Sequence, residues 1–276
     1  MKWTPGYKSD DVEVRRGSGG GGGGLPLGLI SMIGSRFGIG GIVVAVLAFG
    51  AFQFFTSRGA TEEPAVADAP AGQANPDERV QFASFVLDDV QRAWAKKMPS
   101  YQRAKMVIFN NSTSTGCGYG DSAVGPFYCP ADRQVYLDLS FFQTLEKKLG
   151  AGGDFAQAYV IAHEVGHHVQ NQLGVKANRA TGADSDSVKM ELQADCYAGV
   201  WAHSTAQRNL LETGDVEEAM NAASQIGDDR LQKMGRGSVQ PESWTHGSSA
   251  QRVQWFKRGY ESGDPEACDT FKLSAR

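Results

Sequence analysis

Two histidines four residues apart, with a glutamate directly after the first, are the residues of this sequence best suited to chemistry. His163, Glu164 and His167 form an H-E-x-x-H motif within a stretch of helical periodicity. Residues i and i+4 share one helix face, about 6 Å apart, so both imidazoles can bind one zinc ion. Glu164 lies about 100° further around the helix, where its carboxylate can reach a water beside the metal. The motif therefore predicts a zinc site with Glu164 as general base.

A second segment carries acidic residues at the same helical spacing. Glu191 and Asp195 lie four residues apart in the sequence ELQAD. A catalytic zinc ion keeps three protein ligands and one open position, so we expect Glu191 to be the third ligand, from a neighbouring antiparallel helix. Asp195, one turn later, is expected to accept the second N–H of a ligating histidine and to fix its tautomer. Without the histidine motif, this pattern would more simply indicate a solvated acidic helix face.

The other three histidines carry weaker signals. His168 points about 100° away from His167 around the helix, so we expect a structural or exposed residue there, and we assign no role to His203. His246 opens a predicted helix. It is either a capping or exposed residue or a hydrogen-bond donor to the oxyanion of a transition state, and the sequence leaves both possibilities open.

The elements that position these residues follow from hydrophobic periodicity and from glycine and proline breaks. We expect strands at residues 105–109 and 134–139, and residues 135–139 are a candidate edge strand for an extended peptide. Helices are expected at residues 77–97, 140–149, 154–173, 187–208, 215–233 and 248–260.

The sequence before residue 77 differs in composition from the rest. Residues 1–36 are polar and glycine-rich, residues 37–55 (FGIGGIVVAVLAFGAFQFF) contain no charge, and residues 56–76 resemble a flexible linker. Nineteen helical residues span about 28 Å, close to the thickness of a hydrocarbon core. We therefore expect a transmembrane helix at 37–55, in preference to a buried core helix or a cleaved signal peptide, and a folded domain at 77–276.

Charges around this apolar segment predict its orientation. Basic residues precede it and acidic residues follow it, so we expect a single-pass protein of the inner membrane, with its N-terminus in the cytoplasm and its domain in the periplasm or otherwise extracytoplasmic. An oxidising compartment permits disulfides. Four cysteines allow three pairings, of which we favour Cys117 with Cys129 and Cys196 with Cys268. The net charge of -4 provides no basic field for nucleic acid.

Several stretches resemble a known family. HEVGHHVQ, ELQADCYAG, KSDDVEVRRG, YCPADRQVYLDLSFF and HGSSAQRVQWFKRGY are similar to the bacterial neutral zinc metallopeptidases (YpfJ-like), and the likeness covers nearly the whole chain. The resemblance implies a gluzincin-type site, with Zn²⁺ held by His163, His167 and Glu191 and with Glu164 as the base. It also implies an α+β, mostly helical, zincin-like domain with a small sheet, behind one N-terminal transmembrane helix.

Together these features predict a membrane-anchored zinc metalloendopeptidase that hydrolyses peptide or protein substrates with a zinc-activated water. Two alternatives stay open. One is a zinc-stabilised module that binds envelope components without proteolysis, and the other is a zinc amidase acting on peptidoglycan. A binding module needs the metal ligands but not Glu164, so the presence of Glu164 favours an enzyme.

Overall fold

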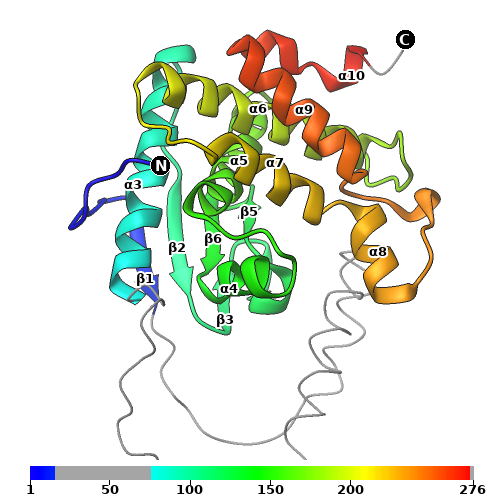
Figure 1. The fold of residues 1–276 in the computed structure, drawn as a ribbon, viewed down its shortest axis with the longest axis horizontal. Helices are drawn as coiled ribbons and strands as arrows, with labels where there is room; N and C mark the ends of the chain where they lie inside the picture. The colour runs from blue at the N-terminus through cyan, green and yellow to red at the C-terminus, as the bar shows by residue number, and fades with distance from the viewer. Residues whose placement is uncertain (16–75, 274–276) are drawn as a thin grey trace, which may run out of the picture.

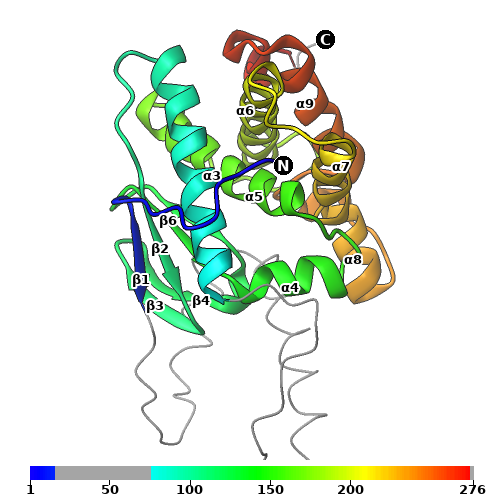
Figure 2. The same ribbon diagram turned by 60° about the vertical axis from the view of Figure 1, so that its left-hand side comes forward.

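The computed structural model, which describes residues 1–15 and 76–273, places a small mixed sheet beside a larger group of helices (Figures 1 and 2). The expectation of a mostly helical α+β fold with a small sheet is confirmed. The strands are β1 (Val12–Arg15), β2 (Lys105–Phe109), β3 (Ser112–Thr115), β4 (Gly118–Asp121), β5 (Phe127–Cys129) and β6 (Gln134–Asp138). The helices of more than one turn are α3 (Pro76–Lys97), α4 (Ser140–Lys147), α5 (Asp154–Gln172), α6 (Asp186–Gln207), α7 (Asp215–Gln225), α8 (Asp228–Arg236) and α9 (Ser249–Ser262).

The main sheet has the strand order β1-β2-β6-β5, with the first three strands parallel and β5 antiparallel to β6. Alternate residues of β2 face opposite sides. Met106 and Ile108 join the main core with the helices, whereas Val107 and Phe109 join a smaller cluster on the other face. Strand β6 is internal, so the expectation of an edge strand at residues 135–139 was wrong. Because β5 pairs outside β6, β5 forms that edge.

Residues 1–15 belong to the folded unit. Strand β1 pairs with β2 along its full length, from Val12 opposite Met106 to Arg15 opposite Phe109. Upstream of β1, aromatic rings at residues 3 and 7 pack edge-on against Phe82 and Phe85 of α3. This differs from the expected cytoplasmic tail at residues 1–36 and domain start at residue 77. A strand cannot pair with β2 across a bilayer, so residues 1–15 lie on the same side of any membrane as the residues after 76.

The apolar segment at residues 37–55 and the linker at 56–76 lie outside the described residues, except for Pro76, which opens α3. Within residues 1–15 and 76–273, no helix is both long enough and apolar enough to cross a membrane. The expected transmembrane helix therefore stays a prediction.

Glycines set the close packing of α6 against α9, which lie beside each other in Figure 1. A Cβ atom on Gly259 would lie 1.9 Å from the carbonyl oxygen of Cys196, and one on Gly199 would lie 2.1 Å from that of Phe256. Neither position tolerates a side chain without moving a helix. The expected single helix at 215–233 is divided into α7 and α8 at Gly227, where the backbone is extended and a Cβ atom would lie 2.3 Å from the backbone nitrogen of Ser249.

Both favoured disulfides are present. Cys117 pairs with Cys129 beside the β3–β4 hairpin, and Cys196 of α6 pairs with Cys268 near the end of the chain. In the chain-entropy account, the longer loop closed by the second bond gives it the larger stabilising effect, about 4 kcal/mol.

Candidate metal centre

Helix α5 carries the H-E-x-x-H motif at the side that faces α6. His163 and Glu164 are buried and His167 is partly buried. The two ligand rings lie on consecutive turns, with centroids 4.8 Å apart and planes at 89°. The side-chain geometry therefore brings two imidazole nitrogens toward one point, as the helical spacing predicts.

Glu191 of α6 completes a set of three ligand atoms. Its Oε2 lies 3.2 Å from Nε2 of His163, and its Oε1 lies 3.5 Å from Nε2 of His167. A tetrahedral zinc ion with bonds of about 2.1 Å separates its ligand atoms by about 3.4 Å. The three residues therefore fit zinc in both donor type and spacing, since two imidazoles and one carboxylate suit this ion.

The close approach of α5 and α6 depends on Gly166, inside the motif. A Cβ atom there would lie 3.1 Å from both Cα and O of Ala194. The contacts between the helices run in opposite order along the chain, from Tyr159 with Asp195 to His167 with Glu191, so the helices are antiparallel, as expected. A side chain at residue 166 would push α6 away and would carry Glu191 with it.

His163 is held by a buried ionic network. Its Nδ1 lies 2.8 Å from Oδ1 of Asp195, which is fully buried. Arg252 of α9 donates to both oxygens of this carboxylate, at 2.8 Å from Nε and 2.9 Å from Nη2, and the hydroxyl of Tyr159 donates to Oδ1 as well. The predicted contact of Asp195 with a ligating histidine is thus present. With Nδ1–H bound to a carboxylate, Nε2 of His163 is free to bind a metal.

His167 is held by neutral groups instead. Its Nδ1 lies 2.8 Å from Oε1 of Gln170, one turn later on α5. The amide nitrogen of Gln170 donates to the carbonyl oxygen of Met190 at 2.7 Å. This arrangement also leaves Nε2 of His167 directed toward Glu191.

Burial and neighbouring charges shift the protonation of the site. Burial alone lowers the pKa of His163, but Asp195 and Glu191 outweigh it and raise the value to about 10. Burial raises the pKa of Glu191, yet His167 and His163 bring it well below its usual range. The pKa of Glu164 is raised, chiefly by burial, with the two histidines opposing. A carboxylate with a raised pKa is a better proton acceptor at neutral pH.

His246 lies just before α9, with its side chain 46% exposed. Asp228 holds the segment before α9, because its Oδ2 accepts backbone N–H bonds from residues 245, 246 and 247. Its Oδ1 lies 3.2 Å from Nδ1 of His246. Burial alone would lower the pKa of His246, but the carboxylates of Asp228 and Glu191 outweigh burial, so the pKa is raised.

The remaining histidines are structural. His168 is fully buried and bonds to Tyr128 and to the carbonyl oxygen of Gln102, and His203 bonds to the carbonyl oxygen of Tyr260. Sequence reasoning missed the residues that contact the candidate ligands or their supporting side chains, namely Tyr159, Gln170, Gln193 and Arg252, and it missed Asp228, which holds His246. Arg252 falls in the stretch HGSSAQR, which is part of the family resemblance. That resemblance was the only feature of the sequence that drew attention to Arg252.

Comparison with known proteins agrees with this geometry. A family model described as "Putative neutral zinc metallopeptidase" matches residues 1–271. The chain belongs to this zinc metallopeptidase family. The uncharacterized protein YpfJ of Escherichia coli K12 is 47% identical over 294 aligned residues, covering 99% of this chain and 100% of that protein. The uncharacterized protein Mb2605 of Mycobacterium bovis is 48% identical over 201 residues, covering 68% of this chain and 69% of that protein. No solved structure matches at a significant level. Membership in the family implies Zn²⁺ as the cofactor.

Proposed function

We propose that this member of the zinc metallopeptidase family is an endopeptidase that cleaves peptide bonds in protein substrates, with His163, His167 and Glu191 as the metal ligands. The observation that carries the proposal is the position of Glu164. Its carboxylate is buried beside the three ligand side chains. Among the described residues, no side chain forms a hydrogen bond or ion pair with it, so it is free to exchange a proton.

The chemistry divides between the metal and the side chains. When bound, zinc acts as a Lewis acid that polarises the peptide carbonyl and lowers the pKa of water. Glu164 accepts the proton that the attacking water loses, and then gives it to the nitrogen of the leaving amine. The water oxygen thereby joins the carbonyl carbon as the C–N bond breaks. In this proposal His246, which Asp228 holds, donates a hydrogen bond to the oxygen that becomes negative.

Substitution of Glu164 tests the enzyme assignment directly. We expect Glu164→Gln to retain zinc and to lose at least about 10²-fold in the rate of casein or peptide cleavage, because the base is gone while the ligands remain. The full chain would be assayed for zinc content and for cleavage of protein and peptidoglycan in parallel. Glu261→Gln, an exposed change on α9, is the control. Equal cleavage by both variants would contradict the role of Glu164. Zinc in all forms with cleavage in none would favour the binding module, and cleavage of peptidoglycan alone would favour the amidase.

We also propose that the domain is extracytoplasmic and is attached to the inner membrane through residues 37–55. The two disulfides support an oxidising compartment. Because β1 and β2 share a sheet, this proposal places residues 1–15 on the same side of the membrane as the domain. It therefore has an extracytoplasmic N-terminus in place of the cytoplasmic one expected from the charges. With both flanking parts on one face, attachment then requires an even number of crossings, or an insertion that does not cross the membrane, between residues 15 and 76.

Cysteine labelling of intact cells tests this arrangement. Thr4→Cys and Lys257→Cys place thiols at two exposed positions, one in each part of the chain. We expect a membrane-impermeant maleimide to label both in cells whose inner membrane is intact. Labelling of residue 257 alone, with residue 4 reacting only after permeabilisation, would restore the single crossing with a cytoplasmic N-terminus.

A further inference from the structure

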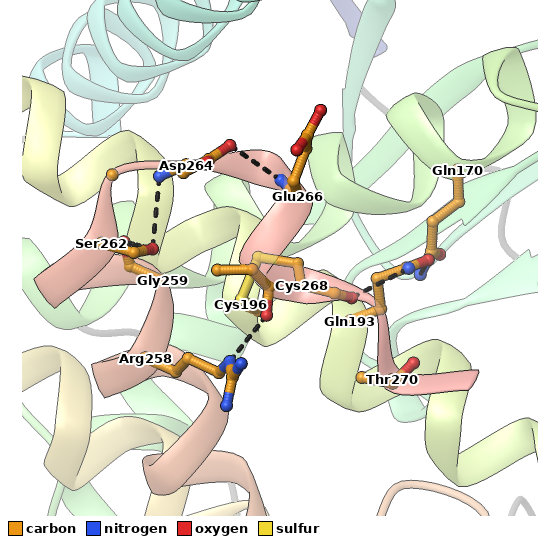
Figure 3. Close-up of a disulfide and its surroundings, with 12 residues drawn as sticks. Gln170, Gln193, Cys196, Arg258, Gly259, Ser262, Asp264, Glu266, Cys268 and Thr270 are labelled. Carbon is orange, nitrogen blue, oxygen red and sulfur yellow. Dashed lines mark hydrogen bonds between the residues drawn. A yellow bond between two sulfur atoms is a disulfide. The ribbon is translucent and has the colours of Figure 1, made fainter. Parts of the chain in front are cut away.

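A buried row of amide groups connects the candidate metal ligand His167 to the Cys196–Cys268 disulfide. Figure 3 shows the part of this row from Gln170 to Cys268. The row begins at Gln170, whose Oε1 lies 2.8 Å from Nδ1 of His167. Its Nε2 lies 3.1 Å from Oε1 of Gln193 on α6, and Nε2 of Gln193 lies 3.0 Å from the carbonyl oxygen of Cys268. Gln170, Gln193 and Cys268 are all buried, so water does not compete for these bonds.

Two backbone carbonyls fix the direction of every bond in this row. A carbonyl oxygen can only accept, so Gln193 must turn its NH₂ group to Cys268 and its oxygen to Gln170. Gln170 must therefore donate, and it also donates to the carbonyl of Met190. Its own oxygen is then left for His167, which must carry its proton on Nδ1. Nε2 of His167 consequently presents a lone pair toward the metal.

The disulfide holds the far end of the row. Cys268 lies in a short segment after α9, and its bond to Cys196 attaches that segment to α6, the helix that also carries Gln193. Thr270 adds a bond from its hydroxyl to the carbonyl of Lys189, also on α6. In Figure 3 the disulfide and Gln193 lie on the same side of α6, with the carbonyl of Cys268 pointing to the amide.

We propose that Gln170 and Gln193 are positioning residues for His167, and that the Cys196–Cys268 disulfide anchors them, so that full zinc affinity requires this bond to be formed. The inference rests on the zinc site of the proposed peptidase but not on its catalysis. The Cys117–Cys129 disulfide lies beside the hairpin and contacts none of these groups, so it offers a matched control. Because the longer Cys196–Cys268 loop also gives the larger general stabilisation, zinc affinity is compared under conditions in which both cysteine variants are fully folded.

The test is zinc affinity, measured on the full chain by competition with a chelating dye, with no substrate present. We expect Gln170→Leu to weaken binding about 10- to 100-fold, as for other residues that orient metal ligands. Gln193→Leu and the double variant Cys196→Ser/Cys268→Ser should each weaken it about three- to tenfold, the effect of one lost hydrogen bond. Cys117→Ser/Cys129→Ser should leave it unchanged.

Combination of the changes separates the row from general loss of structure. In the Gln193→Leu background, removal of Cys196–Cys268 should cause no further loss of affinity, because the connection is already broken. Additive losses, equal effects of the two disulfides, or unchanged affinity in Gln170→Leu would each overturn the proposal. If the cysteine variant does not fold, nitrogen NMR of the His167 ring in Gln193→Leu decides the question. We expect a larger share of the Nε2–H tautomer there than in the unsubstituted chain, because Gln170 is then oriented only by its bond to the carbonyl of Met190, and the same tautomer ratio in both would refute the proposal.

Because these readouts need no cleavage, failure of the proposed peptidase activity would leave them unaffected. If the chain binds zinc as described but cleaves nothing, the proposed positioning of His167 stands and the proposed peptidase activity does not.

Discussion

The two histidines of the candidate zinc site are equivalent in the motif but are supported in opposite ways. His163 is bound by Asp195, whose charge is balanced by the fully buried guanidinium of Arg252. His167 is bound by Gln170, an uncharged amide whose orientation is set by backbone carbonyls. Both supports direct Nε2 toward the metal. The carboxylate of Asp195 also helps to raise the pKa of the His163 ring, so protons compete with zinc for His163, whereas the contact of His167 with Gln170 involves no charged side chain.

The difference between the two supports should be clearest in the free energy of unfolding, because a buried charge without its partner is strongly destabilising. Asp195→Asn leaves Arg252 buried without a carboxylate, and we expect the free energy of unfolding to fall by about 3–5 kcal/mol. Urea denaturation of the zinc-free chain measures this. The exposed pair of Lys257 and Glu261 provides the control, since Glu261→Gln should change stability by at most about 0.5 kcal/mol. Similar effects of the two substitutions would mean that the ionic network contributes little.

Zinc binding should depend on pH through His163. Its pKa of about 10 means that the zinc-free protein holds a proton there at neutral pH, and zinc must displace it. Affinity should therefore rise with pH by close to tenfold per unit between about pH 6.5 and 8.5. The dependence should become weaker in Asp195→Asn, which lacks the group that raises this pKa. A pH-independent affinity in the unsubstituted chain would show that His163 is already neutral, and would remove the contrast with His167.

The smallest effect is expected at the hydroxyl of Tyr159, which shares Asp195 with two stronger donors. Tyr159→Phe removes one bond to Oδ1 of Asp195 but leaves those from His163 and Arg252. We expect a loss of about 0.5–1.5 kcal/mol in stability, with unchanged zinc affinity, by thermal unfolding and dye competition. A large drop in zinc affinity would mean that Tyr159 is essential to the orientation of the carboxylate.

Local sequence patterns indicated the candidate ligands, which the structure brings together, because H-E-x-x-H and the spacing of Glu191 from Asp195 are short-range features of helices. The same periodicity predicted α3, α5, α6 and α9 to within two residues at each end. The groups that orient the ligands escaped prediction because their contacts join separate helices. Arg252 meets Asp195 only where α9 packs on α6, and Gln170 meets Gln193 only across the α5–α6 contact.

Two errors in the predicted elements have the same tertiary origin. Strand β1 is a four-residue segment with two charged residues, and its partner lies about 90 positions later. Its alternation of apolar and charged residues has the period of a strand, but four residues are the shortest stretch in which this signal counts. The break between α7 and α8 falls at Gly227, where the backbone of Ser249 comes too close for a side chain. Glycine within a helical pattern indicates a possible break, but its cause lies in a contact that the local sequence does not encode.

The place of β1 in the sheet bears on how the protein can be handled. A chain that began at residue 77, where the composition suggests a boundary, would expose the whole length of β2 as an open edge. It would also uncover the rings of Phe82 and Phe85, which pack against Trp3 and Tyr7. An unprotected edge strand beside apolar surface is a template for self-association. Such a fragment would be prone to aggregate during purification. If it were inactive, the truncation would be the cause, and the result would say nothing about the activity of the full chain.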